Sequence, residues 1–187
     1  MRRGGARRAL TGRVTDLPSL RETLDAHGLS AKKSFGQHFL LDLNVTRKIV
    51  RLAGPFEGRA VIEVGPGPGG LTRALLESEA GKVVLVEKDP RFIPLLTELD
   101  DGSGRLAIVE ADALKVREAD LVQGPAHLVS NLPYNVGTAL LIKWLTGPWL
   151  PHALTLMFQK EVAERVAAAP GDEAYGRLAV ISQAVCT

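Results

Sequence analysis

Short apolar runs alternate with segments of helical periodicity along most of the chain. Five apolar runs predict buried strands, at residues 60–64, 82–86, 106–109, 126–130 and 153–158. Helices are expected after them, over residues 70–79, 90–99, 136–146 and 160–168. This alternation is typical of a doubly wound, mainly parallel α/β sheet. We therefore predict that fold class.

Two helices are predicted before the first strand and one after the last. The first begins at Asp16 or Ser19, and the second is capped by Asp42 or Asn44. The buried face of the second helix is expected to consist of Val45, Ile49, Leu52 and Ala53. Residues 177–185 are compatible with a helix or an apolar strand, and we favour the helix.

Composition adds little to this picture, because 187 residues with a net charge of +2 suit an ordinary globular domain. The single Cys186 excludes an intrachain disulfide and fits a reducing cytoplasm, and the apolar runs are too short for a membrane span. Residues 1–15 form an arginine-rich head that we expect to be a disordered tail. It could touch phosphates or simply be solvated.

A glycine-rich turn joins the first predicted strand to its helix. Gly65, Gly67 and Gly70 satisfy the G-x-G-x-x-G pattern, which alone is weak because it also marks dinucleotide sites and tight turns. Glu63 stands just before the first glycine. Its carboxylate would suit a ligand that carries an amine or a sulfonium-linked amino acid, rather than a pyrophosphate.

Two further acids end the next two strands. Glu87 is placed to accept hydrogen bonds from ribose hydroxyls, and Asp112 from an adenine amino group, with Leu114 against the ring. Asp112 could instead cap a turn. Because ligands of such sheets bind beyond the carboxyl ends of the strands, the two acids and the glycine turn together predict a site for adenosine without phosphate.

The fourth strand ends in Asn131-Leu132-Pro133-Tyr134. The Asn131 side chain and the Leu132 carbonyl can accept hydrogen bonds from an exocyclic amine, while Pro133 stiffens the turn and Tyr134 offers a stacking surface. This set suits alkylation of a nucleobase amino group. The alternative is an ordinary strand end with a half-buried tyrosine.

Residues 30–187 resemble the ribosomal RNA adenine dimethyltransferases of the small-subunit type. The matching stretches are residues 33–40, 61–71, 86–89, 112–113, 131–135, 159–162 and 175–178. The resemblance implies a Rossmann-like class I methyltransferase fold and S-adenosyl-L-methionine as methyl donor. It implies N6,N6-dimethylation of two adjacent adenines near the 3′ end of small-subunit ribosomal RNA, in ribosome biogenesis, by a cytoplasmic protein expected to be monomeric.

The resemblance also assigns cofactor contacts by position. These would be His38, Leu40, Gly65, Glu87, Asp112 and Asn131, to which the residue pattern itself adds Glu63 and Gly67. His38 is expected to close the cofactor pocket rather than to act as a base, since the amine loses its proton only after transfer. No metal site is expected. Family members continue into further strands and a small helical RNA-binding domain, so residues 16–187 are expected to be a methyltransferase domain lacking its C-terminal part.

The sequence is also compatible with other functions. The chemistry is shared with large-subunit adenine methyltransferases that confer antibiotic resistance, and a truncated module could bind cofactor or RNA without turnover. A nicotinamide-dependent oxidoreductase would use the glycines and Glu87 but would give no function to the turn at residues 131–134. His27, His127 and His152 are expected at the surface or in turns, and Phe158 in the core.

Overall fold

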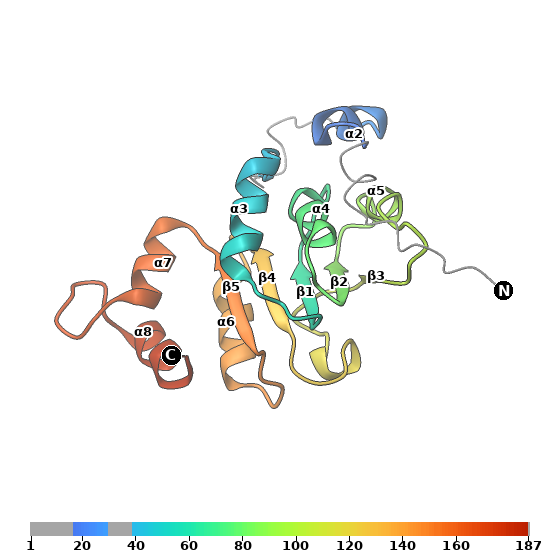
Figure 1. The fold of residues 1–187 in the computed structure, drawn as a ribbon. Coiled ribbons are helices and arrows are strands. Elements are labelled where there is room, and N and C mark those ends of the chain that lie inside the picture. Colours follow the sequence, from blue (N-terminus) through green and yellow to red (C-terminus); the bar gives the residue numbers. More distant parts are fainter. Residues whose placement is uncertain (1–16, 30–38, 187) are drawn as a thin grey trace.

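The computed structural model describes residues 17–29 and 39–186. The expected tail at residues 1–15 and the expected cofactor contact His38 lie outside these residues. Five parallel strands form one sheet in the order β3-β2-β1-β4-β5 (Figure 1). Their bounds are β1 Ala60–Val64, β2 Lys82–Glu87, β3 Leu106–Glu110, β4 His127–Asn131 and β5 Ala153–Met157. The doubly wound α/β class is confirmed.

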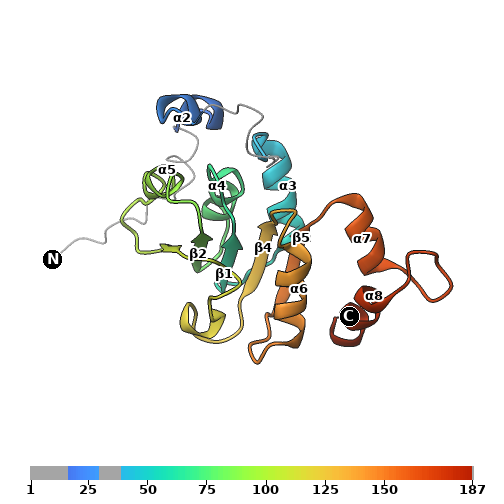
Figure 2. The same cartoon turned by 180° about the vertical axis from the view of Figure 1, so that it is seen from behind.

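Helices cover both faces of the sheet, and successive residues of a strand pack into the cores on opposite faces. Val61 of β1 belongs to the core beneath α2 (Leu20–Ala26), α3 (Leu43–Ala53), α4 (Gly70–Glu77) and α5 (Ile93–Thr97). Its neighbour Ile62 packs in the opposite core with α6 (Gly137–Thr146), which Figure 2 shows in front of β5.

Three shorter or outer helices complete the fold. They are the 3-10 helix η2 (Glu118–Asp120), α7 (Lys160–Ala167) and α8 (Arg177–Val185). The helix favoured for residues 177–185 is therefore confirmed. Among the described residues, none of the helices is both long enough and apolar enough to traverse a bilayer.

The strand order reverses between β1 and β4. The chain runs from β1 outward to β3 and then returns to add β4 and β5 on the other side. β1 and β4 pair in parallel, with Val61 opposite His127 and Ile62 opposite Leu128. Farther along, the buried Ser130 hydroxyl donates a hydrogen bond of 2.5 Å to the carbonyl of Val64. A reversal of this kind leaves a crevice at the carboxyl ends of the strands.

The predicted caps before β1 are largely confirmed, but the predicted face of α3 is partly wrong. Ser19 caps α2, and Asp42 caps α3 by accepting from the amide of Asn44 at 2.8 Å. Val45 is 44% exposed and Leu52 is 74% exposed, while Thr46, Val50 and Ala53 are buried. Burial of Thr46 is possible because its hydroxyl donates to the Leu43 carbonyl at 3.1 Å within the same helix.

The helix after β2 begins later than Asp89-Pro90 suggests. The carbonyl of Asp89 accepts from the amide of Phe92 at 3.1 Å, and its carboxylate accepts from the amide of Arg91 at 3.0 Å. These bonds close a turn, so that α5 starts only at Ile93. The predicted apolar face is confirmed, because Phe92, Leu95, Leu96 and Leu99 are all buried.

One histidine differs from expectation. His127 was expected at the surface or in a turn but is 4% exposed, with its ring packed edge-on against Phe56 at a centroid distance of 5.0 Å. It begins the central strand β4, where packing overrides the polarity of the ring. His27 lies exposed in the turn after α2, as expected, and its Nε2 is 3.0 Å from a carboxylate oxygen of Glu98. Both contacts join residues that are distant in the sequence, so no local sequence pattern predicts them.

Candidate functional site

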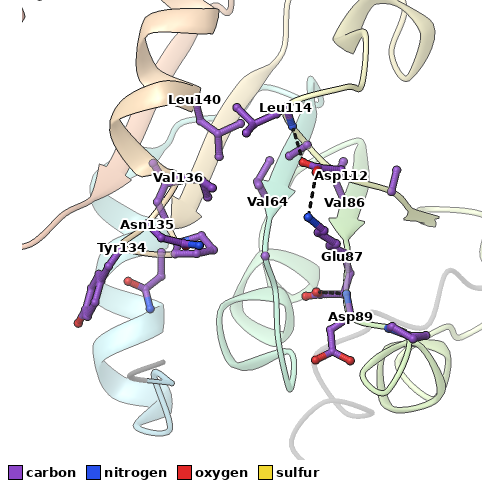
Figure 3. Close-up of a pocket in the computed structure, with 18 of the residues that line it drawn as sticks. Val64, Val86, Glu87, Asp89, Asp112, Leu114, Tyr134, Asn135, Val136 and Leu140 are labelled. Carbon is purple, nitrogen blue, oxygen red and sulfur yellow. Dashed lines mark hydrogen bonds and ion pairs between the residues drawn. The ribbon is translucent and has the colours of Figure 1, made fainter. Parts of the chain in front are cut away.

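A cavity of about 450 Å³ opens at the carboxyl edge of the sheet. Its lining comes from residues 64–65, 86–90, 111–114 and 131–136, with Phe39 and Leu140. Four successive strand ends therefore contribute to one space. Figure 3 shows Glu87 and Asp112 on one wall and Tyr134 and Asn135 on the other.

The glycine turn after β1 is approached closely by two other segments. Gly65 has a φ of 66°, and a Cβ at this position would lie 3.2 Å from Cγ of Pro133. Gly67 has a φ of 53°, and a Cβ there would lie 2.9 Å from the ring of Phe39. A side chain at either position would meet both backbone strain and crowding. The turn thus holds the residues 131–134 and the Phe39 ring against the strand ends.

Glu87 faces the cavity and is held by backbone amides. One carboxylate oxygen accepts from the amide of Gly67 at 3.1 Å and the other from the amide of Asp89 at 2.8 Å. Burial raises the pKa of Glu87, while these backbone hydrogen bonds oppose the rise. An oriented acid in this place fits the ribose hydroxyls of a nucleoside, as the sequence predicts.

Asp112 lies on the same wall, at the end of the next strand. Its carboxylate accepts from Nζ of Lys88 at 2.9 Å and from the amide of Leu114 at 3.1 Å. The hydrogen bond from Lys88 lowers the pKa of Asp112, so that the group stays an acceptor. With the half-exposed Leu114 beside it, this pair fits the polar edge and flat face of an adenine ring.

The turn after β4 forms the opposite wall. Asn131 ends β4, and Leu132 is buried beneath it. The Pro133 carbonyl accepts from the amide of Gly137 at 3.0 Å, which links the turn directly to α6. Tyr134 is 47% exposed, so its ring remains accessible from solvent. This wall offers polar groups and an aromatic surface to a second molecule.

Glu63, by contrast, does not line the cavity. The residue is 2% exposed and points to the face of β1 that α4 covers, where its carboxylate accepts from the Thr72 hydroxyl at 2.7 Å. Burial raises the pKa of Glu63 to about 8. Strand alternation explains the difference, because Val64 points into the cavity and its neighbour must point away. Contact between Glu63 and a ligand is therefore not supported by this geometry.

Two other expected contacts support the site from outside. Gly67 does not line the cavity but donates its amide to Glu87. Leu40 also lies outside the lining, and its carbonyl packs so close to Gly70 that a Cβ there would collide with it. The lining also includes Lys88 and Leu140, which no motif in the sequence indicates. Leu140 could have been found from its place one turn into the helix that follows Tyr134.

The sheet order and the glycine turn give the chain the Rossmann-like fold of the class I methyltransferases, whose cofactor is S-adenosylmethionine, and solved methyltransferases share this fold. A family model described as ribosomal RNA adenine dimethylase matches residues 28–187. The chain belongs to that family.

Curated relatives and solved structures agree with this assignment. The chain is 71% identical over 169 residues to ribosomal RNA small subunit methyltransferase A of Phenylobacterium zucineum, covering 90% of this chain and 59% of the relative. It is 69% identical over 157 residues to the protein of that name from Caulobacter vibrioides, covering 83% and 60%. The chain thus spans about 60% of the length of these relatives.

Two crystal structures are similar in sequence as well as in fold. A dimethyladenosine transferase from Plasmodium falciparum matches with a TM-score of 0.68 and 32% identity, over 78% of this chain and 52% of the other. The 23S rRNA methyltransferase ErmE matches with a TM-score of 0.65 and 30% identity, over 76% and 56%. The expected family is confirmed.

We predict that Gly65→Ala weakens binding of S-adenosylmethionine by about tenfold or more, equivalent to about 1.4 kcal/mol. The added methyl group would push against Pro133 and shift the turn that forms the second wall. Gly102→Ala is the matched control, because Gly102 has a similar φ of 73° with nothing within 4 Å of an added Cβ. Isothermal titration calorimetry would measure both; equal affinities in the two variants would contradict the prediction.

We also predict that Glu63→Gln changes how stability depends on pH. Between about pH 4.5 and 8 the unfolded chain releases the Glu63 proton and the folded chain keeps it, so wild-type stability falls as the pH rises through this window. The amide cannot titrate, so the stability of the variant relative to wild type should increase from pH 5 to pH 8. Urea unfolding at several pH values measures this. The exposed Glu173→Gln is the control, and parallel curves for wild type and Glu63→Gln would refute the assignment.

Proposed function

We propose that this protein transfers methyl groups from S-adenosylmethionine to the N6 atoms of two adjacent adenines near the 3′ end of small-subunit ribosomal RNA. The family match and the curated relatives at 71% and 69% identity support this proposal. Its setting would be ribosome biogenesis in the cytoplasm, with the protein acting as a monomer on RNA or a pre-ribosomal particle.

One observation carries the proposal: two complementary walls face each other across one cavity. Glu87 and Asp112, on the side we call the donor wall, supply hydrogen-bond acceptors for an adenosine-containing methyl donor. Asn131 and Tyr134, on the side we call the acceptor wall, supply an amide and an aromatic ring for a flat, amine-bearing methyl acceptor. The contact between Gly65 and Pro133 fixes the two walls relative to each other. Donor and acceptor sites are therefore adjacent.

The chemistry of an adenine amine explains why these groups are needed. The lone pair of N6 is delocalised into the ring, so the nitrogen is a poor nucleophile. In the proposed complex, the Asn131 side-chain oxygen and the Leu132 carbonyl accept the N6 hydrogens and localise the pair. Tyr134 stacks on a base that has left the RNA stack, and Pro133 keeps the acceptors in register.

The bound cofactor would supply a methyl group activated by a sulfonium sulfur. Glu87 and Asp112 would hold this cofactor, whose methyl carbon would pass to the N6 lone pair, with S-adenosylhomocysteine as the leaving group and a proton released from N6 to solvent. No strong base is required, since the proton leaves after the bond has formed. The contribution of the protein is mostly positioning and electrostatics, and a second cycle gives the dimethylated amine.

Three other functions compete with this one. ErmE, titled a 23S rRNA methyltransferase, is 30% identical, whereas the small-subunit relatives named above are far more similar. A nicotinamide-dependent oxidoreductase would leave Asn131 and Tyr134 without a role. A module that binds cofactor or RNA without turnover would share the donor wall, and only a transfer assay separates it from an enzyme.

The proposed substrate can be tested by mapping methylation. The 187-residue chain would be incubated with S-adenosylmethionine and, in separate reactions, with unmethylated small and large ribosomal subunits, and primer extension would locate stops at dimethylated adenines. We expect two adjacent stops near the 3′ end of the small-subunit RNA. Stops confined to large-subunit RNA would favour the resistance-type activity, and cofactor binding without any stop would favour the non-catalytic module.

In the same assay, we predict that Asn131→Ala lowers methyl transfer by at least about a hundredfold, because an acceptor for the N6 hydrogens is lost. The thermal midpoint should change little, since Asn131 is only partly buried. The control is Asn44→Ala on the exposed face of α3. Transfer at the wild-type rate by the purified Asn131 variant would show that this role is wrong.

A further inference from the structure

A lysine on α6 is bonded to the segment that carries the donor wall. Nζ of Lys143 donates to the carbonyl of Ala113 at 2.8 Å and to the carbonyl of Val116 at 2.6 Å. It also donates to a carboxylate oxygen of Glu118 at 2.6 Å. All three acceptors lie after β3, between 25 and 30 residues before the lysine in the chain.

The same carboxylate oxygen binds a second donor from α6. Nε1 of Trp144 donates to Glu118 at 2.7 Å, and Trp144 is 1% exposed while Glu118 is 7% exposed. Burying charged groups is costly unless their hydrogen-bonding capacity is met. An apolar contact would join α6 to the loop after β3 at a lower desolvation cost. Unlike an apolar contact, the hydrogen bonds of this network fix the distance and orientation of the loop relative to the helix.

The bonded segment is part of the cavity. Residues 111–114 line it, and Asp112 lies directly before Ala113, whose carbonyl Lys143 binds. The segment has few internal bonds of its own, such as the 2.8 Å bond from the amide of Lys115 to the Asp112 carbonyl. Lys143 therefore anchors this short turn from outside, at Ala113 within the turn and at Val116 directly after it.

The helix that carries Lys143 also supports the opposite wall. α6 follows the residues 131–136 without a break, and Leu140 near its start lines the cavity. Lys143 follows Leu140 by three residues, so the two side chains project from neighbouring turns on one side of the helix. One rigid helix thus contacts the acceptor wall through its first turn and the donor wall through Lys143.

We infer that Lys143 is a positioning residue, whose ammonium group fixes the segment 111–116 to α6 and so sets the donor wall relative to the acceptor wall. The inference rests on the proposed function. The lysine does not line the cavity, so it would act through Ala113 and Asp112 rather than by touching a ligand.

Lys143→Met tests the inference, with S-adenosylhomocysteine as the calorimetric probe. We expect the dissociation constant to rise by about tenfold, as for the loss of hydrogen bonds from a charged group. In the transfer assay, KM for S-adenosylmethionine should rise and kcat at saturating cofactor should also fall, because the two walls are no longer held in register. Hydrogen exchange should speed up at residues 112–116. Lys48→Met, on the exposed face of α3, is the matched control.

A second variant separates positioning from stability. Lys143→Met leaves the buried Glu118 carboxylate without its cationic partner, which alone lowers stability. Lys143→Met combined with Glu118→Gln removes that charge and keeps an acceptor for Trp144. We expect the thermal midpoint to recover in this double variant while the weak affinity persists, because the carbonyls of Ala113 and Val116 remain unanchored.

The outcomes distinguish the two proposals. Wild-type affinity in Lys143→Met, or recovery of affinity together with stability in the double variant, would overturn the positioning role and leave the proposed function intact. Failure of the unsubstituted chain to bind S-adenosylhomocysteine would overturn the proposed function, and this inference with it.

Discussion

The close approach of the glycine turn after β1 to the proline turn after β4 is the constraint on which the site depends. A Cβ on Gly65 would crowd Pro133 at 3.2 Å, and this contact lies where the strand order reverses. Because the two turns meet, groups from strands that are distant in sequence share one cavity. The acids on one wall and the amide on the other would otherwise belong to separate surfaces.

Two buried glutamates show how environment separates similar residues. Burial raises the pKa of both Glu63 and Glu87, but only Glu87 receives backbone amides from a neighbouring turn and faces the cavity. Glu63 meets a threonine hydroxyl under α4. Glu63 therefore supports the fold beneath the turn, whereas Glu87 is oriented as a hydrogen-bond acceptor for a ligand.

The sequence predicts the strands well, because apolar runs are local patterns, and its strand-end motifs lie together around one cavity. It fails where the packing of an element decides which side is buried. Thr46 lies on the buried side of α3, which its hydrogen-bonded hydroxyl permits, while Leu52 is exposed. His127 is buried by its place in a central strand. The bonds of Lys143 join segments whose spacing carries no recognisable pattern.

The bond from Ser130 to the Val64 carbonyl has a consequence for how the crevice is maintained. The bond joins β1 to β4 near their carboxyl ends, and it satisfies a buried carbonyl with a side-chain hydroxyl. Because Val64 also lines the cavity, the two strands are tied together directly beneath it. An incoming molecule would therefore rest on a surface that does not have to become ordered on binding.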